Sequence, residues 1–224
     1  MKKPKIFIAC DTTNLNEIKK IIKDTQNSKI KFGYKFGLEL LNSKQGRRFV
    51  ANLRGKITFG DYKLADIPNT CESAIKAVRD LKFNYITIHI SSGLKALKAA
   101  KRVSGSTKLI GVTILTSLDN KSLKEIGFNK DVKKLVRHQA KLATKAKLDA
   151  IVCSPHEIKI VKKVFKKEII TPGIRLPKDK KGDQKRVMTP KQAFQNGATT
   201  LVMGRSIIRG SIKDNIKKII NHLS

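Results

Sequence analysis

The stretch I-T-F-G-D-Y-K-L-A-D-I-P-N-T, residues 57–70, decides how this chain is expected to fold. It begins with apolar and β-branched residues, and its end, I-P-N-T, forms a proline turn that closes an extended segment. The residues that follow are apolar at helical spacing, at Ala74, Ile75, Ala77, Val78 and Leu81. The stretch therefore predicts a strand, a loop and a helix in succession.

Three charged residues, Asp61, Lys63 and Asp66, lie within six positions of this stretch. Side chains alternate faces along a strand, so Asp61 and Lys63 are expected to point the same way, with Asp66 just past the strand end. Charge pairs usually lie on solvated surfaces and contribute little to stability. Here we expect the trio in a strand-to-helix loop, and this position favours a functional site.

The same alternation of strand and helix recurs along the chain. Eight β-rich runs are found, at residues 5–10, 30–37, 56–61, 85–89, 109–115, 150–153, 168–171 and 200–203. Helical spacing between them is seen, for example, at Leu15, Ile18, Ile21, Ile22 and at Val132, Leu135, Val136. An open doubly wound sheet is the alternative, but no G-x-G-x-x-G follows the first run. The pattern predicts an α/β fold, a single (β/α)8 TIM barrel, with residues 1–224 as one domain.

Composition limits the class of protein. A hydrophobic content of 40% with no Trp predicts a core built mostly from Ile, Leu, Val and Ala. The longest apolar runs have only strand length, so we expect no membrane span, no signal peptide and a cytoplasmic location. The cysteines and histidines lack the spacing of metal ligands, which predicts three buried thiols and no zinc site. Among the histidines, only His89, at a strand end, is expected near a site.

The net charge of +32 comes from 49 Lys and Arg against 17 Asp and Glu. A nucleic-acid-binding protein would concentrate its basic residues on one face or interleave them with aromatic residues. In this chain lysines occur in nearly every predicted helix instead. We interpret the charge as a compositional bias of the surface that also steers anionic substrates, and we expect no specific nucleic-acid partner. Tight RNA or DNA binding in a filter assay would contradict this interpretation.

Chemistry in a barrel lies at the carboxyl ends of the strands, and this chain has charged or hydroxyl residues at most of those positions. A single one is commonly only a helix cap. The recurring positions are Asp11, Lys35, Asp61, Lys63, Thr116, Arg175 and Arg205. Barrels commonly bind phosphate after strands seven and eight, where Gly173 and Gly204 allow close backbone approach. The sequence predicts a phosphorylated substrate, with its phosphate near the arginines and its reacting atom near the aspartates and lysines.

These residues resemble the orotidine 5′-phosphate decarboxylase family over essentially the whole chain. The resemblance is carried by I-A-C-D at 8–11, K-F-G-L-E-L at 35–40, D-Y-K-L-A-D-I-P-N-T at 61–70, V-T-I-L-T-S at 112–117, V-C-S at 152–154, T-P-G-I-R at 171–175, G-D-Q-K-R-V-M-T-P at 182–190 and M-G-R at 203–205. D-x-K-x-x-D alone is moderately specific, but its combination with T-P-G-I-R and D-Q-K-R in this order is strongly specific. The departures, at Gly60, Leu64, Ala65 and the H-I-S-S-G after strand four, touch no residue given a role.

The resemblance implies decarboxylation of orotidine 5′-monophosphate to uridine 5′-monophosphate, the last step of pyrimidine synthesis, without metal or cofactor. It implies a homodimer with shared sites, in which Asp66 and Thr70 reach the partner's site. The implied catalytic residues are Lys63, as proton donor to C6, with Asp61, Asp66 and Lys35. The implied substrate-binding residues are Asp11, Lys35, Asp61, Ile67, Thr70, Thr116, Pro172, Arg175, Gln184, Gly204 and Arg205.

Three alternatives stay open at this point. Lys31 precedes a similar K-F-G context, so a register slip could replace Lys35 by Lys31. Sugar-phosphate enzymes of the same superfamily, such as 3-keto-gulonate 6-phosphate decarboxylase or hexulose-phosphate synthase, share D-x-K-x-x-D but use magnesium, for which Glu39 is the only extra acidic candidate. A basic nucleic-acid-binding protein could keep the barrel as a scaffold, but it would not need Asp61, Lys63 and Asp66 together.

Overall fold

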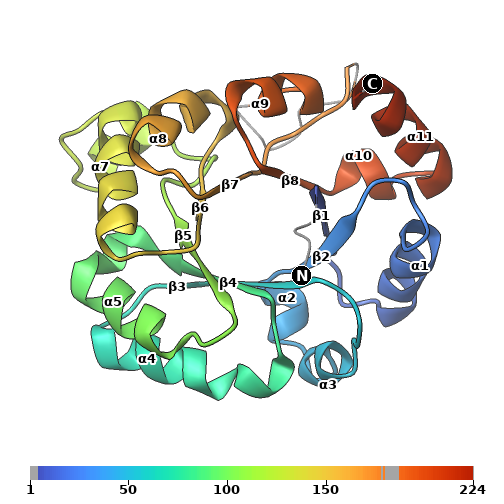
Figure 1. Ribbon diagram of the computed structural model, residues 1–224, viewed down its shortest axis with the longest axis horizontal. Helices are drawn as coiled ribbons and strands as arrows, with labels where there is room; N and C mark the ends of the chain where they lie inside the picture. The colour runs from blue at the N-terminus through green and yellow to red at the C-terminus, as the bar shows by residue number, and fades with distance from the viewer. Residues whose placement is uncertain (1–4, 178, 180–186, 224) are drawn as a thin grey trace.

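Eight parallel strands form a closed barrel surrounded by helices, in a computed structural model that describes residues 5–177, 179 and 187–223 (Figure 1). The strands are β1 Ile6–Ala9, β2 Phe32–Phe36, β3 Thr58–Leu64, β4 Tyr85–His89, β5 Lys108–Val112, β6 Ala150–Val152, β7 Glu168–Thr171 and β8 Thr200–Met203. Each strand pairs with the next along the chain, and β8 pairs with β1. The expected (β/α)8 TIM barrel is confirmed, whereas the extension of one domain over all 224 residues stays a prediction.

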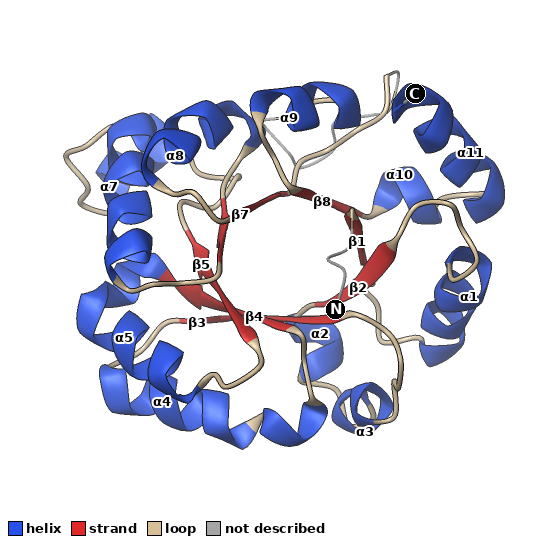
Figure 2. Ribbon diagram, viewed as in Figure 1, coloured by secondary structure: helices blue, strands red, loops and turns tan. Residues whose placement is uncertain are grey.

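The helices form an outer ring around the strands (Figure 2). They are α1 Leu15–Thr25, α2 Leu38–Leu41, α3 Gly46–Ala51, α4 Pro68–Ala77, α5 Gly93–Val103, α6 Asn120–Glu125, α7 Val132–Lys145, α8 Ile158–Val164, α9 Pro190–Asn196, α10 Arg205–Ile208 and α11 Ile212–Leu223, with short 3₁₀ turns η1 Arg79–Leu81, η2 Ile90–Ser92 and η3 Pro155–Glu157. The apolar spacing explains how they pack, since α1 buries Ile18, Ile21 and Ile22 against the barrel. No helix in the described ranges is long and apolar enough to cross a membrane.

Strand β3 runs further than the sequence pattern predicts. It continues to Leu64, so Asp61 and Lys63 lie inside the strand, and the expectation that they lie in the following loop is wrong. The pairing of β3 with β4 shifts register between Gly60 and Leu64, which marks a β-bulge. Lys63 has a φ of 49° there, a left-handed conformation that is uncommon for a residue other than glycine. Because of this bulge, β3 continues beyond Asp61, where the sequence pattern predicted its end.

The core has two layers with different compositions. Between barrel and helices it consists mainly of Ile, Leu, Val and Ala, as the composition predicts. Inside the barrel three aromatic rings pack together: Phe7 lies edge-on to Phe59 and to Tyr85, with ring centroids 5.0 and 5.1 Å apart. At the amino ends of the strands Tyr85 donates to Glu168 over 3.1 Å, and Lys108 pairs with the same carboxylate. This polar cluster occupies the amino-terminal end of the barrel and leaves the carboxyl-terminal end for the site.

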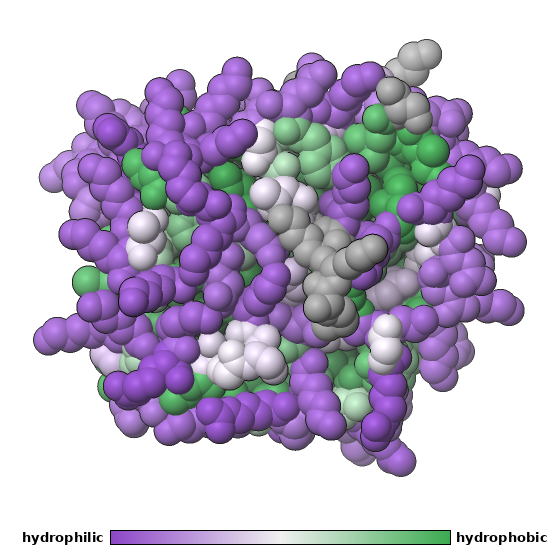
Figure 3. Space-filling view, viewed as in Figure 1, coloured by the Kyte–Doolittle hydropathy of each residue, from purple (hydrophilic) through white to green (hydrophobic). Residues whose placement is uncertain are grey.

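Hydrophilic side chains are spread over most of the face shown in Figure 3, without gathering over one element. This spread agrees with a lysine bias distributed along the chain. Cys10, Cys71 and Cys153 are buried, as the sequence predicts, and no disulfide joins them. Burial raises the pKa of Cys10 to about 12, so this thiol stays protonated and chemically inert at neutral pH.

Candidate active site

A cavity of about 510 Å³ opens at the carboxyl ends of the strands. Ten residues singled out from the sequence line it: Asp11, Lys35, Asp61, Lys63, Thr116, Pro172, Gly173, Arg175, Gly204 and Arg205. They belong to, or follow, six of the eight strands, from residue 11 after β1 to residue 205 after β8. Closure of the barrel brings these distant segments of sequence to one rim.

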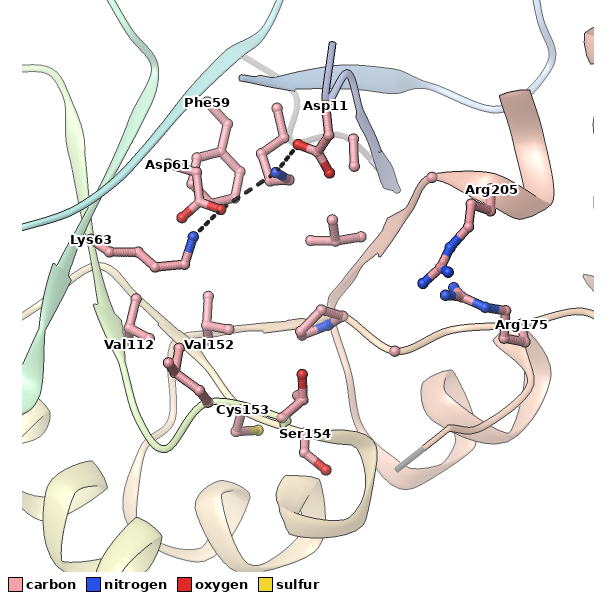
Figure 4. Close-up of a pocket in the computed structure, with 18 of the residues that line it drawn as sticks. Asp11, Phe59, Asp61, Lys63, Val112, Val152, Cys153, Ser154, Arg175 and Arg205 are labelled. Carbon is pink, nitrogen blue, oxygen red and sulfur yellow. Dashed lines mark hydrogen bonds and ion pairs between the residues drawn. The ribbon is translucent and has the colours of Figure 1, made fainter. Parts of the chain in front are cut away.

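Four of these residues form a row of alternating charge along one wall. The Lys35 ammonium donates to Asp11 Oδ1 over 2.8 Å and lies 3.4 Å from Asp61 Oδ2. The Lys63 ammonium donates to the same Asp61 oxygen over 2.8 Å. Figure 4 shows the Lys63 nitrogen pointing into the cavity beside Asp61. Each charge in the row has an opposite neighbour, and Lys63 at its end faces the open space.

The strands hold this row by backbone pairing. Lys35 lies in β2 opposite Ala9 of β1 and Phe59 of β3, and its carbonyl accepts from the Cys10 N–H over 2.9 Å. Its side chain is only 11% exposed. Lys31 is exposed before β2 begins, so the register that brings Lys35 to the cavity is the one observed. A lysine this buried requires the counter-charges that Asp11 and Asp61 provide.

For Asp61 and Lys35, the charges of their neighbours outweigh burial in setting the direction of the pKa shift. Burial alone would raise the pKa of Asp61, but the ammonium groups of Lys35 and Lys63, with hydrogen bonds from Lys63 and Thr87, lower it below its ordinary value. Burial would lower the pKa of Lys35, but Asp61 and Asp11 raise it above its ordinary value. Asp61 and Lys35 therefore both stay charged at neutral pH.

We expect the charge of Asp61 to show in the acid dependence of stability. Its folded-state pKa lies below 3.8, so its stabilisation is complete above that ordinary value and is lost as the pH falls through the lowered pKa. Urea unfolding between about pH 2 and pH 6 should give a steeper acid loss of unfolding free energy for the wild type than for Asp61→Asn, by about 1 kcal/mol or more. Asp80→Asn is the control, because Asp80 belongs to an exposed pair with Arg47. Parallel curves for Asp61→Asn and the wild type would contradict the lowered pKa.

The opposite wall carries two arginines. Arg175 follows β7 and Arg205 begins α10 after β8, and in Figure 4 both guanidinium groups point toward the same part of the cavity, across from Lys63 and Asp61. Gly173 has a φ of 75°, which L-residues rarely adopt, and it turns the chain between β7 and Arg175. Two cations directed at one region form a binding site for a doubly charged anion such as phosphate.

The sequence reasoning missed the apolar floor between the two charged walls. It consists of Ala9, Phe59, Val112, Val152 and Val202, with Cys153 and Ser154 at its edge. Ala9, Val112, Val152 and Val202 lie at or near the carboxyl ends of their strands, whereas Phe59 is the second residue of β3. Their signal was available, because the last inward-facing residue of every barrel strand must line this end, but the inward register cannot be read from short, continuously apolar strands.

Some expected site residues lie elsewhere in this protomer. Asp66, Ile67 and Thr70 are exposed beyond β3, and Asp66 accepts a hydrogen bond from the Ile67 N–H over 2.7 Å. Within the described part of the chain, Asp66 forms no ion pair with Lys63. Gln184, which the resemblance implies as a substrate-binding residue, lies outside the described residues. Asp66, Ile67 and Thr70, in the loop after β3 and in the first turn of α4, are therefore not among the residues that line the cavity of their own protomer.

Two further polar residues lie outside the cavity lining. Glu39 is exposed within α2. Among the described residues, no group of three or more His, Cys, Asp and Glu side chains has the arrangement of a metal site. His89 ends β4, and burial together with the nearby Lys63 charge lowers its pKa, so it is neutral at pH 7.

A closed parallel barrel with a charged cavity at the carboxyl ends of its strands defines an enzyme of the TIM-barrel class. The chain belongs to the Orotidine 5′-phosphate decarboxylase / HUMPS family, whose model matches residues 4–216. The expected family is therefore confirmed.

Named relatives are similar in sequence to this chain over most of its length. It is 41% identical over 217 residues to an orotidine 5′-phosphate decarboxylase of Prochlorococcus marinus (strain MIT 9215), with 91% of this chain and 88% of that protein covered. It is 39% identical to the protein of that name from Sphingopyxis alaskensis, with 93% and 94% covered. The crystal structure of orotidine 5′-phosphate decarboxylase from Lactobacillus acidophilus matches with a TM-score of 0.83 and 28% identity over 99% of this chain and 100% of that one.

Proposed function

We propose that this chain decarboxylates orotidine 5′-monophosphate to uridine 5′-monophosphate and carbon dioxide, the final step of pyrimidine biosynthesis, without a metal or organic cofactor. The observation that carries the proposal is the division of one cavity into a wall of alternating charge and a wall with two arginines. The relatives named above, at about 40% identity, support it. The buried thiols fit the cytoplasmic location that we also propose.

Lys63 is the proton donor in this proposal. The bond from C6 of the pyrimidine to its carboxylate breaks, carbon dioxide leaves, and the electron pair remains on C6. A localised carbanion needs a fixed positive charge where its charge develops, and the Lys63 ammonium, 2.8 Å from Asp61, supplies both that charge and the proton. Asp61 lies beside the departing carboxylate and repels the substrate more than the transition state.

The rest of the substrate is bound away from C6. We assign the phosphate to Arg205, the Gly204 amide and Gln184, with Arg175 and Pro172 beside it. Thr116 contacts the edge of the pyrimidine, and Asp11 and Lys35 bind the ribose hydroxyls. Binding energy from these remote contacts holds the substrate carboxylate against Asp61, an arrangement that would be unfavourable by itself.

We propose a homodimer in which Asp66, Ile67 and Thr70 complete the partner's site. All three are exposed in one protomer, and Ile67 is 65% exposed. Leu38 and Leu115, which also follow carboxyl ends of strands, are 46% and 37% exposed. Exposed apolar residues around a cavity are typical of an interface core. Asp66 would then add a second carboxylate near the partner's Lys63.

The proposal is tested by following the ultraviolet absorbance of orotidine 5′-monophosphate with the purified wild type, with and without a chelator. We expect turnover that the chelator leaves unchanged. Absence of turnover in the wild type would refute the proposed function. Loss of turnover with the chelator would favour the magnesium-dependent sugar-phosphate enzymes of the same family, which bind the metal through an additional acidic ligand.

A further inference from the structure

Thr87 of β4 links the two residues at the centre of the charged wall. It is fully buried, with 0% exposure, and does not line the cavity. Its hydroxyl accepts a hydrogen bond from the Lys63 backbone N–H over 2.8 Å and donates to Asp61 Oδ1 over 3.1 Å. One hydroxyl therefore holds the backbone of one residue and the side chain of the other.

The contact with Lys63 lies at the bulge in β3. The regular pairing of β3 with β4 is interrupted between Gly60 and Leu64, so the Lys63 N–H falls in the interrupted part of the ladder. The Thr87 hydroxyl accepts a hydrogen bond from this half-buried N–H, at a position where the regular β3–β4 ladder is interrupted. Lys63 also has a φ of 49°, a conformation that persists only where surrounding contacts enforce it.

The direction of both hydrogen bonds is determined by chemistry. A backbone N–H can only donate, so the hydroxyl must use its single proton for the Asp61 carboxylate. Engaging Asp61 Oδ1 in this way fixes the rotation of the carboxylate. Its other oxygen, Oδ2, then faces the Lys63 ammonium at 2.8 Å and the Lys35 ammonium at 3.4 Å.

We propose that Thr87 is a positioning residue for decarboxylation, holding the left-handed backbone of Lys63 and the carboxylate of Asp61 so that the ammonium is directed at the reacting carbon. This inference rests on the proposed function. The residue touches no substrate atom and acts only through Lys63 and Asp61. A displacement of reacting groups by about 1 Å can reduce a rate by about 100-fold.

Thr87→Val is the test variant, because valine keeps the β-branched shape and removes only the hydroxyl. Thr87→Ser keeps the hydroxyl and is the rescue variant. Thr25→Val is the matched control, since Thr25, at the end of α1, is also buried and its hydroxyl forms a hydrogen bond with the Tyr34 hydroxyl over 2.8 Å, away from the cavity. We expect kcat to fall about 10- to 100-fold in Thr87→Val with KM changed less than about threefold. Thr87→Ser and Thr25→Val should stay within about threefold of the wild-type kcat.

A second measurement reports the contact without activity. Hydrogen exchange of the Lys63 amide, followed by NMR, should be about tenfold faster or more in Thr87→Val and near wild type in Thr87→Ser. An unchanged kcat or unchanged Lys63 exchange in Thr87→Val would overturn the inference. So would an equal loss of kcat in Thr87→Ser or Thr25→Val. An inactive wild type would refute the proposed decarboxylation, and the proposed role of Thr87 in that reaction would then be refuted as well.

Discussion

The Lys63→Ala variant is expected to lose turnover of orotidine 5′-monophosphate by a factor of about 10⁴ or more. Two contributions are removed together, the charge that stabilises the carbanion and the proton that quenches it. The remaining cations of the cavity cannot replace them. Lys35 is held between Asp11 and Asp61, and the two arginines lie on the opposite wall of the cavity. The measurement is the loss of substrate absorbance at saturating substrate.

The fold should survive this change. Lys63 is 35% exposed on its side chain, and Asp61 keeps its ion pair with Lys35 when Lys63 is truncated. Lys101→Ala is the control, because Lys101 also forms a half-buried ion pair, with Asp149 at 2.5 Å, but on the outer helix α5. We expect the control to keep wild-type kcat. Turnover by Lys63→Ala within about tenfold of the wild type would rule out Lys63 as proton donor.

The second large expected effect is a gain of decarboxylase activity when two nearly inactive variants of this chain are combined. Lys63→Ala and Asp66→Asn should each have little activity alone. If Asp66 acts in the partner's site, a mixed dimer contains one site with both native residues. Random pairing of equal amounts, after co-refolding or co-expression, should restore about one quarter of wild-type turnover, because half of the dimers are mixed and each has one intact site.

A matched mixture separates shared sites from other causes of the gain. Lys63 and Arg205 line one cavity of one protomer. Mixing Lys63→Ala with Arg205→Ala therefore leaves every site of the mixed dimer with one defect, and no gain above the separate variants is expected. A strict monomer by light scattering, or no gain in the Lys63→Ala and Asp66→Asn mixture, would refute the shared site.

Local pattern predicted most of the strands because strands and amphipathic helices are short-range signals. The strand predicted at 85–89 matches β4, and those at 168–171 and 200–203 match β7 and β8. The run 109–115 was too long, since β5 ends at Val112. The predicted end of β3, at residue 61, came too early, since the strand continues to Leu64. The bulge that allows this depends on pairing with β4 and leaves no pattern in the local sequence. Strand boundaries that depend on a neighbour cannot be read from one strand alone.

The candidate site divides in the same way. Charged residues at strand ends, such as Asp61, Lys63 and Arg205, could be selected from the sequence because a barrel assigns strand ends to one rim. The apolar floor and Thr87 could not. Thr87 lies 26 residues from Asp61 and 24 from Lys63, and nothing in its own segment distinguishes it from an ordinary buried strand residue.

The sequence alone determined the order of strands and helices, the barrel class, the family and the residues that carry charge at the rim. These properties depend on residue type and on spacing within short segments. Only the tertiary structure decided that Asp11, Lys35, Asp61 and Lys63 join into one alternating row, that Lys63 sits in a strained bulge, and that Asp66 turns away from its own cavity. Those properties depend on distances between segments far apart in the chain, which are set when the eight strands close.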